Sequence, residues 1–182
     1  LELWDELAAA GADFGLKPLG THALEIARIE AGFLLSDVDF VPADRAIRPD
    51  RTRSPFELDL AWLVDFKKPH FNGRRALLAE QARGSRYRLV RLVVEGNKIA
   101  KDAFVYDRTR RNVGVVTSAT WSPALKASIA LASIEARSEG ELRVDIYYQK
   151  ELRWSRKMAL CREVDGPFFA PERRRRTPAG DC

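Results

Sequence analysis

The sequence predicts an α+β fold in which helical segments come first and a small antiparallel β-barrel follows. Up to about residue 85, apolar side chains recur at the three- and four-residue spacing of one helix face. From Tyr87 onwards they recur every second residue, as in a strand with one buried face. Turn-like segments separate these short runs, a spacing typical of a small barrel or sandwich.

Three segments of the N-terminal half are predicted helices. The first spans residues 1–10, and its apolar stripe, expected to be buried, consists of Leu3, Trp4, Leu7 and Ala8. The second helix follows a candidate N-cap at Thr21, and the third follows one at Asn72. Glycine readily adopts the left-handed conformation found after a helix, and each predicted helix ends at one: Gly11, Gly32 and Gly84.

A long surface loop is predicted between the second and third helices, over residues 37–53. This segment carries four Asp, four Arg and two Pro, so it cannot bury much apolar surface. Its charges cancel, which argues against a docking site for a polyanion. An apolar pattern returns over residues 54–68, with Trp62 near the middle.

Five strands are predicted after residue 86: 87–94, 102–106, 112–118, 141–149 and 152–161. In the last strand, apolar residues alternate with polar ones, and we expect the apolar set to face the core: Leu152, Trp154, Met158 and Leu160. Four residues near and after the end of the third strand are interpreted as turn formers between strands: Thr117, Ser118, Ser122 and Pro123.

The composition is that of an ordinary globular chain. The 182 residues are 46% hydrophobic and 31% charged, and no apolar run approaches the roughly 20 residues that span a bilayer. Two cysteines are too few for a disulfide framework, and Cys161 is interpreted as a small buried apolar group, so a cytoplasmic location is expected. The net charge of +5 comes mostly from Arg173–Arg176, interpreted as a solvated basic tail.

Four segments carry a family resemblance: GTHALEIARIEAG at 20–32, SPFELDLAWLVDFKKPHFNGRRAL at 54–77, VGVVTSATWSPALKASIALA at 113–132, and PFFAP at 167–171. In this order and spacing they resemble the glycine-cleavage T-protein (aminomethyltransferase) family. The resemblance implies that residues 1–85 are the C-terminal portion of a folate-binding α/β core. Residues 86–166 would be the family's C-terminal β-barrel, and residues 167–182 a basic tail.

The same resemblance implies tetrahydrofolate as cofactor and a small methylated or aminomethyl substrate. The family's catalytic aspartate would lie upstream of Leu1, so no catalytic residue is assigned here. The chain is expected to be inactive without that N-terminal half. Two departures point towards the demethylase or dimethylglycine-dehydrogenase-like branch: Leu24-Glu25 replaces a common Arg-Asp pair, and the 37–53 loop is longer.

Four residues are candidate folate contacts. Arg28 is suited to orienting a carboxylate because its guanidinium forms a two-pronged fork, although an ion pair with Glu25 one turn away is the structural alternative. Trp62 could stack on a flat ring or lie in a core. Glu57 could line the site or be an ordinary surface charge, and Arg174 could meet the carboxylates of the folate tail. His22 and His70 lack neighbouring ligands, so no metal site is expected.

Two alternatives remain open from the sequence. The first is that the basic β-barrel is a non-catalytic module that binds nucleic acid. Such modules interleave aromatic and basic residues, whereas here the arginines cluster in the tail, which argues against nucleic acid as a partner. The chain could also be a folate-domain fragment of a flavin amine dehydrogenase.

Overall fold

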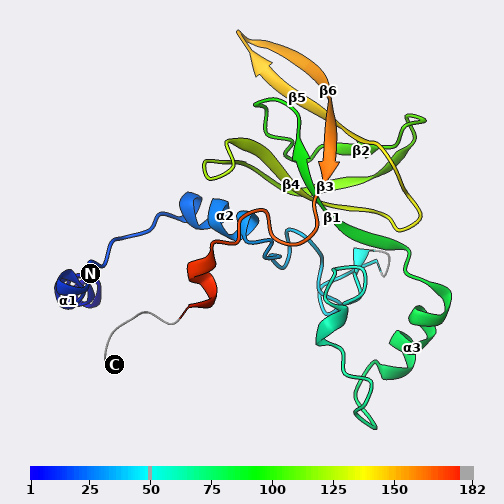
Figure 1. Cartoon of the computed structure of the whole chain (residues 1–182), viewed down its shortest axis with the longest axis horizontal. Helices are drawn as coiled ribbons and strands as arrows, with labels where there is room; N and C mark the ends of the chain where they lie inside the picture. Colours follow the sequence, from blue (N-terminus) through cyan, green and yellow to red (C-terminus); the bar gives the residue numbers. More distant parts are fainter. Residues whose placement is uncertain (49–50, 177–182) are drawn as a thin grey trace.

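The computed structural model describes residues 1–48 and 51–176, except for the side chains of Arg173 and Arg174. Helices come first and strands follow, so the α+β class is confirmed (Figure 1). The α-helices are α1 (Glu2–Gly11), α2 (Thr21–Glu30) and α3 (Arg74–Arg83). Among the described residues, short 3-10 helices are η1 (Ala12–Phe14), η3 (Ala61–Leu63) and η4 (Glu172–Arg175). The strands are β1 (Tyr87–Val94), β2 (Phe104–Tyr106), β3 (Asn112–Ser122), β4 (Ala127–Glu135), β5 (Leu142–Lys150) and β6 (Arg153–Glu163).

The strands form a closed antiparallel barrel in the order β1-β4-β3-β2-β5-β6, with β6 pairing back to β1. Its seams differ in length. Eight residue pairs join β1 to β4, and nine join β5 to β6. Only three pairs join β6 to β1, and the short β2 makes three on each side.

Two apolar clusters stabilise this part of the molecule. The first fills the barrel, where Leu92, Val105 and Val144 have no exposed surface. The second joins α2 to the outside of the barrel through Ile29, Leu89, Ile129 and Leu131, with Leu34, Val93 and Phe168 packed against them. Each fully buried aliphatic side chain of this kind contributes about 1.5–3 kcal/mol relative to an exposed one, so the second cluster fixes α2 on the barrel.

The sequence-based prediction missed one strand, β4. Its sequence is ASIALASIE, and all seven residues between its ends are buried. One face of β4 points into the barrel, and the other is covered by α2 through Ile29. A strand buried on both faces shows no alternation of polar and apolar residues, so the period that identifies the other strands is absent here.

The predicted inner face of β6 is wrong. Ala159 and Cys161 face the core, whereas the larger apolar residues are exposed: Leu152 (91%), Trp154 (74%), Met158 (38%) and Leu160 (41%). Alternation fixes which residues share a face of a strand but not which face is buried. Burial of Cys161 is confirmed, and it raises the pKa of the thiol to about 12.

The predicted apolar stripe of α1 is also not buried. The helix has no buried residue, and Trp4 and Leu7 keep more than half of their surface exposed. Figure 1 shows α1 standing apart from the barrel, connected to α2 by residues 15–20 in a loop. The amphipathic pattern therefore predicted a helix correctly, but none of the residues that the structure describes covers its apolar side.

Smaller differences concern helix ends and loops. The N-caps are Gly20 and Gly73, one residue away from the predicted Thr21 and Asn72. The described part of the 37–53 segment contains turns and one bridge between Ser36 and Phe40, as expected for a loop. Residues 49–50 of that prediction lie outside the described chain.

Candidate functional site

Arg28 lies at the junction of α2, the loop that follows it and the barrel. Its Nε donates to Glu25 at 3.1 Å, and a second nitrogen contacts the other oxygen of the same carboxylate. The remaining donations reach Asp39 Oδ2 at 2.8 Å, Ser118 Oγ at 2.7 Å and the carbonyl of Phe33 at 3.2 Å. The structural alternative for Arg28, an ion pair with Glu25, is therefore present, and the side chain is 11% exposed.

Asp39 is the buried acceptor at this junction. Its Oδ1 accepts from Thr117 Oγ1 at 2.6 Å and from Ser118 Oγ at 2.7 Å. Its Oδ2 accepts from the amide of Leu35 at 2.8 Å as well as from Arg28. The carboxylate of Asp39 has no exposed surface, so its charge is balanced entirely by these contacts. We did not single out Asp39 from the sequence, because it lies among charges that were interpreted as a solvated loop.

The charges at this junction favour one another. The hydrogen bond from Arg28 lowers the pKa of Glu25, against a smaller opposing effect of burial. Burial alone would lower the pKa of Arg28, but the hydrogen bond to Glu25 and the charge of Asp39 outweigh it and raise this pKa. The contact between them therefore favours the ionised forms of both Glu25 and Arg28.

Thr117, Ser118 and Ser122 lie within β3 rather than in a turn, which corrects the sequence interpretation for these three, whereas Pro123 lies in the turn after β3. Thr117 and Ser118 belong to β3 and face Asp39, at a point where the pairing with β4 shifts register. Ser122 closes the strand and contacts Glu30 of α2 through its hydroxyl (2.5 Å). Glu30 also accepts the amide of Phe169 on its backbone carbonyl at 2.9 Å, so the segment after β6 is bound to α2.

Glu57 lies in a separate buried network. One of its oxygens accepts the amide of Ser54 at 3.1 Å, and the other accepts the amide of Tyr87 at 3.2 Å. Ser54 in turn donates from its hydroxyl to Glu80 of α3 at 2.7 Å. Glu57 is 5% exposed, so its carboxylate holds the start of β1 against the 54–57 turn.

Trp62 differs from the other predicted contacts because it is 78% exposed. It lies in η3 next to Leu63, which is 60% exposed, and the two present an uncovered apolar surface. Arg174 lies in η4, and its side chain lies outside the described residues. The structure thus places Arg28 and Glu57 in two internal networks and leaves Trp62 open to a ligand or another protein surface.

Two kinds of site are absent from the described residues. Within residues 1–48 and 51–176, no three His, Cys, Asp or Glu side chains gather as they would around a metal ion. Across the same part of the chain, no helix combines the length and hydropathy needed to cross a membrane.

Known families match the chain in two consecutive blocks. Residues 1–68 match the GCVT N-terminal domain, and residues 88–169 match the glycine cleavage T-protein C-terminal barrel domain. Together the two blocks contain α2, the Arg28–Asp39 junction, Trp62 and the whole barrel. The chain belongs to the glycine cleavage T-protein family.

Relatives with known names agree with this assignment. An aminomethyltransferase of Pseudothermotoga lettingae is 35% identical over 146 residues, which cover 79% of this chain and 38% of the relative. One of Synechococcus is 38% identical over 133 residues, covering 72% and 33%. The match therefore spans only 33–38% of the length of these relatives.

A solved structure shares the fold. The crystal structure of glycine cleavage system aminomethyltransferase T from Bartonella henselae superposes with a TM-score of 0.69 at 24% identity. The match covers 92% of this chain and 43% of that protein. At this identity the likeness concerns the fold, which includes the placement of the helical segment beside the barrel.

Proposed function

We propose that this chain forms the C-terminal part of a tetrahydrofolate-dependent one-carbon transferase, acting on an aminomethyl or methyl donor. The observation that carries the proposal is the pair of family matches in the family's own order, over residues 1–68 and 88–169. In this proposal the chain supplies one wall of the folate pocket and the barrel that supports it, and a further folate-binding portion supplies the rest.

The exposed apolar side chains before the barrel support the proposal that a further portion of the protein packs on them. Leu3, Trp4 and Leu7 of α1 are 57–70% exposed, and Leu24 of α2 is 55% exposed. Isolated exposed apolar residues are common, but a helix whose whole apolar stripe is uncovered marks a contact surface. We infer that the rest of the folate-binding portion packs on this surface.

Trp62 is our leading candidate for direct folate contact. A planar, largely exposed indole with no aromatic partner among the described residues can stack on the flat ring system of folate. Arg28 and Glu57 are engaged in internal networks, and we propose that they position α2 and the 54–63 segment. Direct folate contact by Arg28, Glu57 or Arg174 stays a prediction.

The main contribution of the protein to the reaction is to position the reactants. Tetrahydrofolate, when bound, supplies nitrogen atoms that accept the one-carbon unit. The protein's part is to hold those atoms beside the donor carbon in a dry pocket. The Arg28–Asp39 junction serves this by fixing α2 to the barrel, so that a pocket wall built on α2 keeps its position. No proton transfer is assigned to a residue of this chain.

A chimaera tests the proposal directly. The matching C-terminal segment of the Pseudothermotoga lettingae aminomethyltransferase is replaced by this chain, and folding is checked by circular dichroism. We expect the folded chimaera to bind tetrahydrofolate and release methylene-tetrahydrofolate from an aminomethyl donor, whereas the 182-residue chain alone shows no turnover. A folded chimaera that binds no folate would contradict the proposal, and turnover by the isolated chain would contradict the need for a further portion.

Two tryptophan variants of the chimaera separate ring stacking from general destabilisation. Trp62→Ala should weaken tetrahydrofolate binding about 3- to 10-fold, the range expected for the loss of one aromatic contact. Trp154→Ala is the matched control, because Trp154 is similarly exposed (74%) but lies on the barrel. Equal effects of the two substitutions would remove Trp62 from the proposed pocket.

The donor is a finer question within the same proposal. Leu24-Glu25 and the long 37–53 loop favour a methylated amine over an aminomethyl group carried on a protein. The chimaera should then transfer a methyl group from dimethylglycine to N5 of tetrahydrofolate, releasing sarcosine and 5-methyltetrahydrofolate, faster than the intact relative does. An unchanged preference would assign these departures no role in donor choice.

A further inference from the structure

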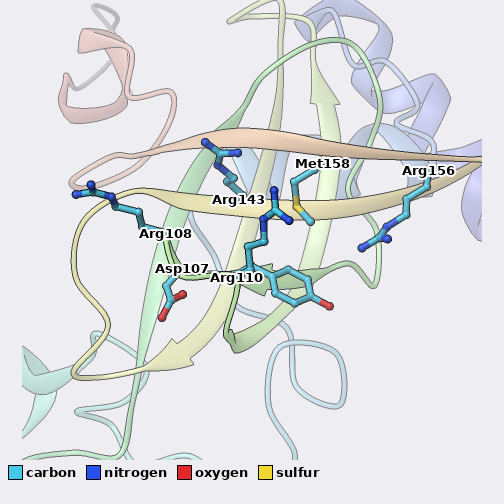
Figure 2. Close-up of a pocket in the computed structure, with 7 residues that line it drawn as sticks. Asp107, Arg108, Arg110, Arg143, Arg156 and Met158 are labelled. Carbon is cyan, nitrogen blue, oxygen red and sulfur yellow. The ribbon is translucent and has the colours of Figure 1, made fainter.

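A hollow of about 620 Å³ lies on the outer side of the barrel, beside the turn between β2 and β3 (Figure 2). Four arginines border it: Arg108 and Arg110 from the turn, Arg143 from β5 and Arg156 from β6. Tyr106 and Met158 contribute apolar lining, and Asp107 of the turn adds a carboxylate to it. None of these residues belongs to α2 or to the 54–63 segment, so the hollow is separate from the proposed folate wall.

The arginines of the hollow are only half neutralised. Arg143 pairs with Glu141 at 2.8 Å, and Arg156 pairs with the buried Asp145 at 2.7 Å. Within residues 1–48 and 51–176, the side chains of Arg108 and Arg110 have neither an ion pair nor a hydrogen bond. Because like charges repel, a hollow bordered by four guanidinium groups, two of them unpaired, is stabilised by an anion bound in it.

The turn that carries the unpaired arginines is ordered by its own contacts. Asp107 Oδ1 accepts from the amide of Thr109 at 2.9 Å, from its hydroxyl at 2.6 Å and from the amide of Arg111 at 3.0 Å. The amide of Asp107 also donates to the carbonyl of Arg111 at 3.0 Å. The arginines therefore project from a formed turn, which lowers the ordering cost of binding.

Arg110 occupies a backbone position that does not favour arginine. Its φ is 65°, in the left-handed region where glycine and asparagine are the usual residues. Arginine at this position therefore does not favour the backbone conformation of the turn. Its side chain points to the hollow (Figure 2).

We propose that this hollow binds a small ligand that carries two or more phosphate or carboxylate groups. Guanidinium forks bind both groups through paired N–H donors, and four of them around one space match a ligand with several anionic groups. The volume lies in the range of small-molecule sites, and the apolar lining accepts a carbon skeleton between the anionic groups.

Calorimetric titration of the full chain with three probes tests the proposal: pyrophosphate, citrate and inorganic phosphate, each at low and high sodium chloride. We expect pyrophosphate or citrate to bind at least about tenfold more tightly than inorganic phosphate, since more charge-assisted contacts form. Tighter binding of pyrophosphate assigns the hollow to phosphorylated ligands, and tighter binding of citrate assigns it to polycarboxylates.

Two substitutions in the same turn separate the hollow from the general field of a basic protein. Arg110→Asn should weaken binding of the tighter probe about tenfold while the midpoint of thermal unfolding stays equal or rises, because asparagine suits φ of 65°. Arg111→Gln removes the same charge from the same turn, but Arg111 does not line the hollow and pairs with Glu135 at 3.0 Å and with Asp107 at 3.4 Å. It should leave the affinity within about twofold.

Three results would overturn the proposal. The first is no heat of binding for any probe at low salt. The second is an equal loss of affinity in the Arg110 and Arg111 variants, which would indicate diffuse attraction. The third is binding of single-stranded oligonucleotides whose affinity grows with length and exceeds that of all three probes, which would make the hollow part of a nucleic-acid track.

Discussion

Asp39 shows how a single carboxylate can connect three parts of a fold. It accepts hydrogen bonds from Arg28 of α2, from the loop amide of Leu35 and from two side chains of β3. The side chains of Asp39 and Ser118 are buried, so they depend on each other and on Arg28 for their hydrogen bonds. The junction thereby fixes the direction of α2 on the barrel, which apolar packing through Ile29 alone would leave less defined.

Replacement of Asp39 by asparagine should be strongly destabilising. The variant leaves the largely buried Arg28 with Glu25 as its one carboxylate partner, and loss of one member of a buried ion pair costs about 3 kcal/mol. Urea unfolding of the chain measures the change. Asp37→Asn is the matched control, because Asp37 pairs with Arg45 at the surface, and it should cost less than about 1 kcal/mol. Similar losses in both variants would contradict the role given to Asp39.

Glu25 should make stability depend on pH in the acid range. Its pKa is lower in the folded chain than its ordinary value of 4.5, so the unfolded chain binds the proton more tightly. The stabilisation is complete above the unfolded pKa and is lost as the pH falls through the lower folded pKa. The difference in free energy of unfolding between the wild-type chain and Glu25→Gln, followed by urea titrations from pH 7 to pH 3, should therefore shrink on acidification. A constant difference would show that Glu25 is not coupled to Arg28.

Among the elements, the sequence predicted helical or strand periodicity better than it predicted which side chains are buried. The alternation in β1 and β5 and the helical spacing in α2 led to correct elements, because each has one covered and one more exposed side. β4 was missed because Ile29 and its neighbours cover the face that would otherwise be wet. The inner face of β6 was misjudged because small residues, Ala159 and Cys161, fill the narrow interior there.

The candidate site was predictable only in part for a related reason. Arg28 could be singled out because it lies in a helix segment that resembles the family. Its main partner, Asp39, could not, because local sequence does not indicate that one carboxylate among alternating charges meets Thr117, 78 residues away. The hollow bordered by Arg108 and Arg156 was missed likewise, since it combines side chains from separate strands and a turn.

The pairing of β3 with β4 is close enough to require glycine at position 114. A Cβ atom on Gly114 would lie 2.2 Å from the carbonyl oxygen of Ser133 and 2.7 Å from the Cα of Ile134. Both are backbone atoms, so the strands would have to separate, and we expect Gly114→Ala to cost about 2–3 kcal/mol in urea unfolding. Gly20→Ala, with no atom within 4 Å, should cost less than about 1 kcal/mol. A well-tolerated Gly114→Ala would show that β3 and β4 are farther apart than described.

At the scale of the whole molecule, the two ends of the chain contribute unequally to stability. Residues 1–19 contain no buried side chain, whereas Phe168 packs against the cluster around Ile29. Deletion of residues 1–19 should therefore change the free energy of unfolding by less than about 0.5 kcal/mol, as for surface changes. Deletion from Pro167 onwards should lower it measurably, because Phe168 leaves its cluster and Phe169 no longer bonds to Glu30.

Thermal unfolding of both truncated chains, followed by circular dichroism in the strand region, checks this contrast. The comparison is internal, since both deletions remove a segment of similar length. A large loss of stability on removal of residues 1–19 would mean that α1 contacts the rest of the chain in solution. It would also weaken the inference that its apolar stripe awaits another surface.

The unequal seams of the barrel have a mechanical consequence. β1, β4 and β3 form one plate of the barrel, and β5 and β6 form another. The plates are joined on one side by three residue pairs between β6 and β1, two flanking backbone hydrogen bonds and the Arg88–Glu163 ion pair, and on the other side by the three-residue β2. We expect the barrel to deform most easily by a tilt of the β5–β6 plate about these two connections. Arg143 and Arg156 lie on the β5–β6 plate, whereas Arg108 and Arg110 lie on the turn beside it. The same tilt would therefore widen or narrow the arginine-lined hollow.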